Sequence, residues 1–96
     1  MLKIVARLTV KKENIDEFKR TAADLIHKSN AEEGNVFYTL NQNVDDEEKF
    51  AFIECWKDND AIKTHSASKH FTETFPLLQK LAESAEPAEV YNELSF

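Results

Sequence analysis

The segment "KFAFIECWK" (residues 49–57) constrains the fold more than any other part of the chain, because it predicts a strand that is apolar on both faces. Side chains alternate between the two faces of a strand. The two faces carry Phe50, Phe52 and Trp56 on one side, and Ala51, Ile53 and Cys55 on the other. Such a strand is usually covered on both sides. One layer of helices covers only one side, so we expect a second subunit to cover the other.

The rest of the chain alternates between strand and helix patterns. The order β-α-β-β-α-β predicts a ferredoxin-like α+β fold, in which two helices cover one face of a four-stranded antiparallel sheet. A chain of 96 residues is long enough for one domain, which spans residues 1–96. The other expected elements are strands over residues 2–10, 35–44 and 88–94, and helices within residues 13–34 and from Ala61 to Ala82.

A few polar, glycine and proline residues indicate where the helices begin and end. Asn14 is a suitable N-cap for the first helix, with a glutamate three residues later as in a capping box. Gly34, the only glycine, fits the left-handed position that ends a helix. One of residues 58–60, all Asp or Asn, is expected to cap the second helix. Pro76 lacks a backbone N–H, so we expect a kink or a break near Phe75.

Composition excludes several classes of protein. No apolar run approaches the ~20 residues that cross a bilayer, and the N-terminus lacks the layout of a signal peptide, so we expect a cytoplasmic protein. The single cysteine, Cys55, cannot form an internal disulfide. A formal net charge of −6 argues against nucleic-acid and anionic-membrane partners. One glycine cannot make a phosphate-binding loop, so no nucleotide, flavin or nicotinamide cofactor is expected.

The segment "FIECWKDNDAIKTHSASKHF" (residues 52–71) concentrates the side chains that could carry chemistry. Trp56 is either core packing or the wall of a substrate pocket, and its indole N–H needs a partner if it is buried. Glu54 shares a strand face with Trp56, where an unpaired carboxylate is costly. It therefore either pairs with a cation, for example Arg7, or lines a wet cavity.

His65 and His70 are the candidate bases. On one regular helix they are separated by about 140° of rotation, so we expect them not to share a metal ion, and no metal site is predicted. Each histidine could simply bond to a backbone carbonyl. Alternatively, one of them faces a cavity with Glu54 and Trp56 and acts as a general base near neutral pH.

The pattern "E-x-W-K-D…A-x-x-x-H…S-x-H-F" resembles that of the antibiotic biosynthesis monooxygenase (ABM) family. The first strand and helix, "V-x-L-T-V-K…N-I-D-E-F", and the later "E-E-G-N…Y-x-L" resemble it more weakly. The resemblance covers roughly residues 2–94 and is strongest to the small bacterial branch of quinol monooxygenases.

This resemblance implies a ferredoxin-like homodimer whose two sheets form a dimeric α/β-barrel, with a pocket between sheet and helices in each subunit. Several family members oxygenate hydroquinones or anthrones with dioxygen and without metal or flavin. By position, the base or substrate-orienting residue would be His65 or His70. The substrate-binding residues would be Trp56, Glu54, Asn41, Tyr38, Phe71 and Arg7.

Other interpretations of the function remain open from the sequence. Haem-degrading relatives use an asparagine on the first strand, where this chain has Ala6, which argues against that activity. A related branch isomerises the phosphorylated autoinducer-2 signal, for which Arg7 and Lys69 could contact a phosphate. A third alternative is a non-catalytic dimer that binds a small apolar ligand. A histidine nitrogen beside Glu54 in a cavity would favour an enzyme, whereas a cationic entrance would favour the phosphorylated substrate.

Overall fold

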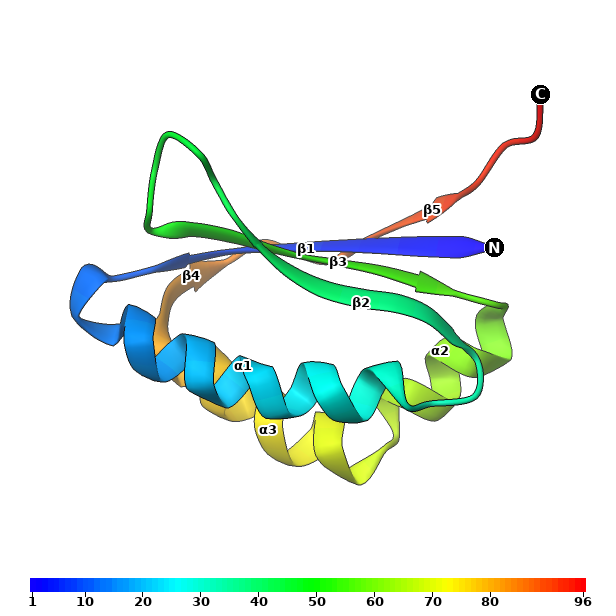
Figure 1. The fold of residues 1–96 in the computed structure, drawn as a ribbon, viewed down its shortest axis with the longest axis horizontal. Helices are drawn as coiled ribbons and strands as arrows, with labels where there is room; N and C mark the ends of the chain where they lie inside the picture. The colour runs from blue at the N-terminus through cyan, green and yellow to red at the C-terminus, as the bar shows by residue number, and fades with distance from the viewer.

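One antiparallel sheet carries every helix on the same side, as Figure 1 shows for the computed structural model, which describes residues 1–96. The two longer helices run in opposite directions beneath the sheet (Figure 1). The elements are β1 (Leu2–Val10), a 3-10 turn (Lys12–Asn14), α1 (Ile15–Asn30), β2 (Asn35–Gln42), β3 (Lys49–Trp56), α2 (Asn59–Ser66), α3 (Lys69–Leu81), β4 (Ala82–Ala85) and β5 (Glu89–Asn92). This arrangement confirms the ferredoxin-like α+β fold.

The sheet has five strands, where the sequence predicted four. Its order is β2-β3-β1-β4, and β5 also pairs with β1. Both β4 and β5 therefore occupy the position expected for one final strand. Pro87 lies between them and has no N–H to donate, so the pairing is interrupted there. The backbone N–H of Glu86 still donates to the Arg7 carbonyl at 2.9 Å, which keeps the two short strands on the same edge of β1.

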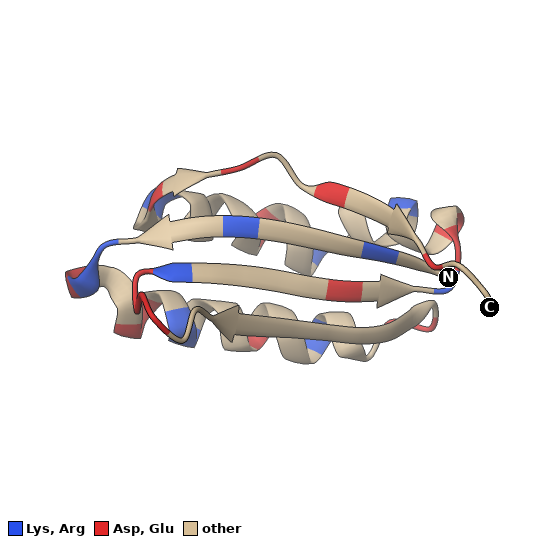
Figure 2. Ribbon diagram, turned by 90° about the horizontal axis from the view of Figure 1, so that it is seen from above, with Lys and Arg blue, Asp and Glu red and all other residues tan.

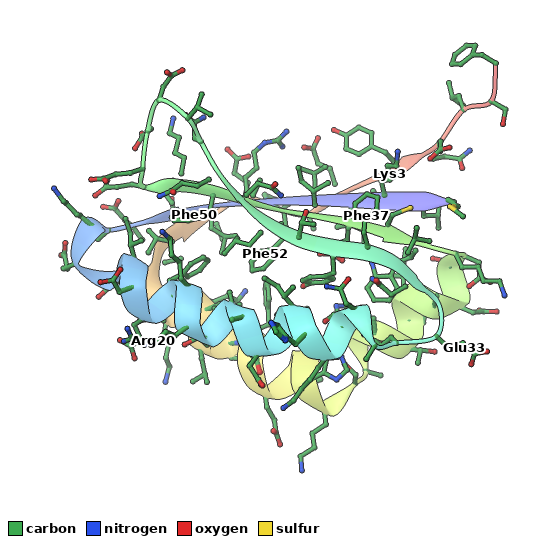
Figure 3. The ribbon with its side chains drawn as sticks, in the orientation of Figure 1. Lys3, Arg20, Glu33, Phe37, Phe50 and Phe52 are labelled. Atoms are coloured by element: carbon green, nitrogen blue, oxygen red, sulfur yellow. The ribbon has the colours of Figure 1, made fainter.

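The core lies between the sheet and the helices. The even-numbered residues of β1 from Ile4 to Val10 are buried, as their alternation predicted. Phe50 and Phe52 extend from β3 toward the helices (Figure 3), and both are buried. The stripe on α1 that the sequence indicated is buried against them: Ile15, Phe18, Ala22 and Leu25. Burying a side chain of this size contributes roughly 1.5–3 kcal/mol to folding.

The second helical segment breaks at a different place from the one predicted. We expected a kink or a break near Phe75, but α3 runs through Pro76 to Leu81. The interruption falls between α2 and α3, where Ser68 has extended backbone angles and its Oγ accepts a hydrogen bond from the Phe71 N–H. An N-cap of this kind starts a new helix in a new direction. The expected cap of α2 is confirmed as Asp58, whose Oδ1 accepts from the Ala61 N–H at 2.8 Å.

Two other boundary predictions are wrong. Helix α1 ends at Asn30, and Gly34 does not adopt a positive φ. Glycine is required there by close packing, because a Cβ atom at position 34 would lie 2.4 Å from the Cβ of Ala61. Asn14 does stand at the start of α1, but its side chain donates to the Leu81 carbonyl instead of capping the helix.

The face of the sheet opposite the helices is not covered within the chain. Figure 2 views this face and shows charged residues spaced apart along the two central strands, β1 and β3, and none on β2. Val5 and Ile53 are only half-buried on it. The C-terminal segment beyond β5 rises from the same side (Figure 1), and its Leu94 and Phe96 are exposed. None of the helices has the length and apolar character that crossing a membrane would require.

Candidate functional site

Three ionisable side chains converge at the end of the molecule where β3 leads into α2. His65 comes from α2, His70 from the first turn of α3, and Glu32 from the connection between α1 and β2. The Oε2 atom of Glu32 lies 2.6 Å from Nδ1 of His65 and 3.0 Å from Nε2 of His70. One carboxylate oxygen thus holds both histidines.

The expectation that the two histidines point in different directions is wrong. It assumed one continuous helix, whereas the break at Ala67 and Ser68 places His65 and His70 on separate helices. Their ring centroids are 5.9 Å apart. The hydroxyl of Ser68 donates to the His65 carbonyl at 2.6 Å, which stabilises the turn that brings the two rings together.

His65 is the most enclosed member of the cluster, with 3% of its side chain exposed. Burial lowers the pKa of His65 even though the Glu32 carboxylate opposes this shift, so we assign a neutral ring. A neutral ring at this distance donates its Nδ1–H to Glu32. Its Nε2 atom is then a lone-pair acceptor, and it is buried without a hydrogen-bond partner.

Glu54 and Trp56 form a buried pair next to this cluster. The Trp56 indole Nε1–H donates to Oε1 of Glu54 at 2.9 Å, so the partner of the indole is this carboxylate and not a histidine. Burial raises the pKa of Glu54 to about 7, although the bond from Trp56 opposes the shift. Arg7 does not pair with Glu54, because it bonds instead to Glu89 at 2.6 Å.

Aromatic rings surround His65 on several sides. The Trp56 ring lies 4.5 Å from the imidazole, measured between centroids, and the Phe71 and Tyr38 rings lie 4.8 Å and 5.3 Å from it. Tyr38 is buried, and burial together with the nearby Glu54 and Glu32 carboxylates raises the pKa of its phenol well above the usual value. Six of the residues that the sequence suggested therefore lie together: Tyr38, Glu54, Trp56, His65, His70 and Phe71.

Two suggested residues lie elsewhere. Arg7 and Asn41 both pair with Ala51 in the strand register, so they are on the sheet face opposite the helices. The Asn41 amide donates to the Thr39 hydroxyl and to the Ala51 carbonyl. These two side chains are thus separated from His65 by the sheet itself.

Sequence reasoning missed Glu32, the residue that organises the cluster. It lies in the segment "NAEEG", which has the composition of a solvated turn, and its partner His65 is 33 residues away. No local pattern signals such a contact. The neighbouring Glu33 is exposed and lies at the outer end of the molecule, where α1 leads into β2 (Figure 3).

A cleft of about 380 Å³ opens beside the cluster. Glu32 and Trp56 both border it, and the short helix α2 forms one of its walls. Its charged residues are three carboxylates and one lysine, so its entrance is acidic. The complete lining is Glu32, Glu33, Gly34, Trp56, Lys57, Asp58, Ala61 and Thr64.

The protein is a small ferredoxin-like α+β domain that encloses a histidine between aromatic rings and a carboxylate. Comparison with known proteins identifies its family. Residues 1–77 match the antibiotic biosynthesis monooxygenase family. The chain is 41% identical over 71 residues to the "Putative monooxygenase YcnE" of Bacillus subtilis (strain 168). This match covers 74% of this chain and 75% of that protein.

Solved structures agree with this match. A conserved protein from Methanosarcina mazei Go1 superposes with a TM-score of 0.92 at 32% identity, covering 97% of this chain and 92% of that one. A variant of SnoaB, a cofactor-independent oxygenase from Streptomyces nogalater, superposes with a TM-score of 0.86 at 23% identity, covering 99% and 94%. The protein belongs to the antibiotic biosynthesis monooxygenase family.

Proposed function

We propose that this protein is a cofactor-independent monooxygenase that oxidises a small aromatic substrate, such as a quinol or an anthrone, with His65 as the general base. The observation that carries the proposal is the state of His65. Its Nδ1 is held by Glu32, and its Nε2, which carries no proton in the tautomer assigned above, is buried without a hydrogen-bond partner. A base that is oriented by a carboxylate and kept neutral by burial is suited to accept a proton near neutral pH.

The proposed reaction needs no group beyond the substrate and dioxygen. Nε2 of His65 accepts the proton of a phenolic hydroxyl, and Glu32 stabilises the imidazolium that forms. The electron-rich anion transfers one electron to dioxygen, which gives a substrate radical and superoxide. These recombine at a ring carbon to a peroxide anion, which takes back the proton from the His65 imidazolium. The resulting hydroperoxide loses water. A hydroquinone and dioxygen thus yield a hydroxyquinone and one water.

The cleft beside Trp56 is the proposed entrance to the site. Of the eight residues in α2, only His65 is fully buried, while Ala61 and Ile62 are partly buried against the core, so the contact between this helix and the body of the protein is small. A small displacement of α2 would open the cleft toward Nε2. The aromatic rings of Trp56 and Phe71 would then contact the faces of a planar substrate.

A phosphorylated substrate is less well supported. The cleft entrance carries Glu32, Glu33 and Asp58 against Lys57 alone, and a phosphate would be repelled. Arg7, which could have contacted a phosphate, is on the other face of the sheet and is bonded to Glu89. The charge of the entrance therefore favours a neutral phenol over a phosphosugar.

The proposal includes a homodimer formed through the uncovered face of the sheet. Val5 and Ile53 are only half-buried on this face, and Cys55 next to them is buried with its Sγ near the Met1 sulfur. The exposed apolar side chains of the C-terminal segment, Val90, Tyr91, Leu94 and Phe96, continue from the same edge. In a symmetric dimer, the same face of a second copy would cover this surface.

Oxygen uptake by metal-free and flavin-free protein tests the proposed reaction. A panel of hydroquinones and anthrones is compared for wild type, His65→Ala, His70→Ala and His27→Ala, the last replacing an exposed histidine on α1. We expect substrate-dependent uptake above the autoxidation rate in wild type and His27→Ala, and its loss in His65→Ala. Uptake that is equal in all four proteins, or absent from wild type with every substrate, contradicts the proposal.

A further inference from the structure

We propose that Glu32, His65 and His70 form a binding site for one divalent transition-metal ion, for which Zn²⁺ is the natural probe. The inference concerns binding alone and does not depend on the oxygenase reaction. It starts from the observation that two imidazole nitrogens approach the same carboxylate oxygen from two different helices.

The geometry is close to that of a metal site with three protein ligands. Nδ1 of His65, Nε2 of His70 and a carboxylate oxygen of Glu32 all lie within 4.8 Å of one another. With metal–ligand bonds of about 2.0–2.2 Å, tetrahedral ligand atoms lie roughly 3.3–3.5 Å apart. The two distances from Glu32 Oε2 to the histidine nitrogens are 2.6 Å and 3.0 Å. Each would have to increase by roughly 0.3–0.9 Å to admit the ion.

The donor set selects the kind of metal. Two imidazoles and one carboxylate suit zinc, iron, cobalt or nickel, whereas magnesium and calcium prefer oxygen ligands alone. Three protein ligands leave one tetrahedral position open for water. Two neutral imidazoles and one carboxylate carry a charge of −1, and the acidic cleft with Glu33 and Asp58 adds attraction for a cation. Lys28 and Lys69 lie near His70, and their positive charges repel a cation.

The ligands are also well placed on the fold. Each comes from a different element, and their side chains are only 3%, 14% and 18% exposed for His65, Glu32 and His70. They are therefore held by packing and partly shielded from water. Both histidine nitrogens already face the same Glu32 oxygen, so the ion needs only a modest separation of these three side chains.

Metal binding has a consequence for His65. A neutral imidazole carries one proton, so coordination through Nδ1 requires that this proton move to Nε2. The nitrogen that is proposed to accept the substrate proton would then be an N–H donor. Zinc and catalysis by His65 would exclude one another, and the ion would inhibit any reaction that uses Nε2 as a base.

Binding is measured on untagged, chelator-treated protein by native mass spectrometry for stoichiometry and by calorimetric titration with Zn²⁺ for affinity. We expect one ion per chain for wild type, and visible absorption bands of low-symmetry cobalt when Co²⁺ replaces zinc. Glu32→Gln and His70→Ala should each weaken zinc binding by about tenfold or more. His27→Ala, which removes the exposed third histidine on α1, should leave it unchanged.

The outcomes separate this site from the proposed oxygenase activity, because zinc affinity is read without substrate. No stoichiometric binding by wild type overturns the proposal, and so does binding that survives in both Glu32→Gln and His70→Ala. Glu32 and His70 are more exposed than His65, so replacing them disturbs the core less. A thermal melt of each metal-free variant establishes that it is folded. Zinc should raise the melting temperature of wild type but not that of Glu32→Gln.

Discussion

Nδ1 of His65 lies 2.6 Å from Oε2 of Glu32, and this contact joins the end of α1 to a helix 33 residues further along the chain. The contact orients the imidazole so that Nε2 is directed away from the carboxylate. It also places a negative charge where it stabilises a protonated ring. Glu32 is therefore a positioning residue for the proposed base, and its effect should be visible in kinetics.

Glu32→Gln should lower kcat by about 10- to 100-fold, because the amide cannot stabilise the imidazolium by charge. Glu32 raises the pKa of His65, so its removal lowers that pKa further. The acid limb of the pH–rate profile should accordingly move to lower pH. Glu17→Gln, at an exposed position on α1, is the matched control. A lower rate with an unmoved acid limb would mean that Glu32 has only a structural role.

Trp56→Ala should destabilise the protein by about 3–5 kcal/mol, because the indole is fully buried in the core. Urea denaturation measures this free energy of unfolding. Val44→Ala shortens an exposed side chain in the β2–β3 connection and should change the same quantity by less than about 0.5 kcal/mol. A loss near zero for Trp56→Ala would contradict the burial of the ring.

The stability of the protein should depend on pH through Glu54. Burial raises its pKa from 4.5 to about 7, so between these values the folded state binds one proton more than the unfolded state. Protonated Glu54 contributes to the free energy of unfolding. This contribution is fully present below pH 4.5, the pKa of Glu54 in the unfolded chain, and is lost as the pH rises through about 7, its pKa in the folded protein. The change amounts to about 3 kcal/mol. Glu54→Gln cannot titrate and still accepts the Trp56 hydrogen bond.

The measurement is the free energy of unfolding of wild type and Glu54→Gln from pH 4 to pH 8. The variant should gain about 3 kcal/mol relative to wild type across this range. Taking the difference between the two proteins removes the titration of His65, which is common to both. If the two stability curves run parallel over this pH range, the pKa of Glu54 is not raised in the folded protein.

Gly34→Ala should destabilise the protein by about 1–3 kcal/mol, because the new Cβ would lie 2.4 Å from the Cβ of Ala61. The prediction has a specific rescue. Ala61→Gly removes the opposing atom, so the double variant should be more stable than Gly34→Ala alone. If the second change adds a further loss, the clash is not the cause.

Ile53→Glu should convert the proposed dimer to a monomer, because it places a carboxylate at the centre of the uncovered sheet face. Analytical ultracentrifugation measures the mass in solution. Leu77→Glu, at an exposed apolar position on α3, is the control and should leave the mass unchanged. A wild-type protein that sediments as a monomer at all concentrations would refute the dimer.

Local patterns were sufficient for the fold. The alternation of residues 2–10 and the stripe of Ile15, Phe18, Ala22 and Leu25 follow from the periods of a strand and a helix, and both are confirmed. These periods arise within a few residues and need no tertiary information. The family and its candidate histidines were likewise recognisable from the short run that ends at Phe71.

Particular contacts, some local and some long-range, decided what the periodic patterns could not. Pro76 is the stronger helix breaker in isolation, yet α3 tolerates it, while Ser68 ends one helix and begins the next through its hydrogen bonds. Gly34 was explained by turn chemistry, whereas its neighbour across space, Ala61, is what requires a glycine. Glu32 has no signal near it in the sequence, because both of its partners lie more than 30 residues away.

The only tryptophan of the chain has its ring centroid 4.5 Å from that of His65 and donates a hydrogen bond to Glu54. The protein therefore contains its own optical reporter. Protonation of the imidazole, ionisation of the carboxylate or entry of a planar ligand would each change the surroundings of a single indole, and its emission can be followed without any label. The same property allows each event to be timed after rapid mixing, in the unmodified protein.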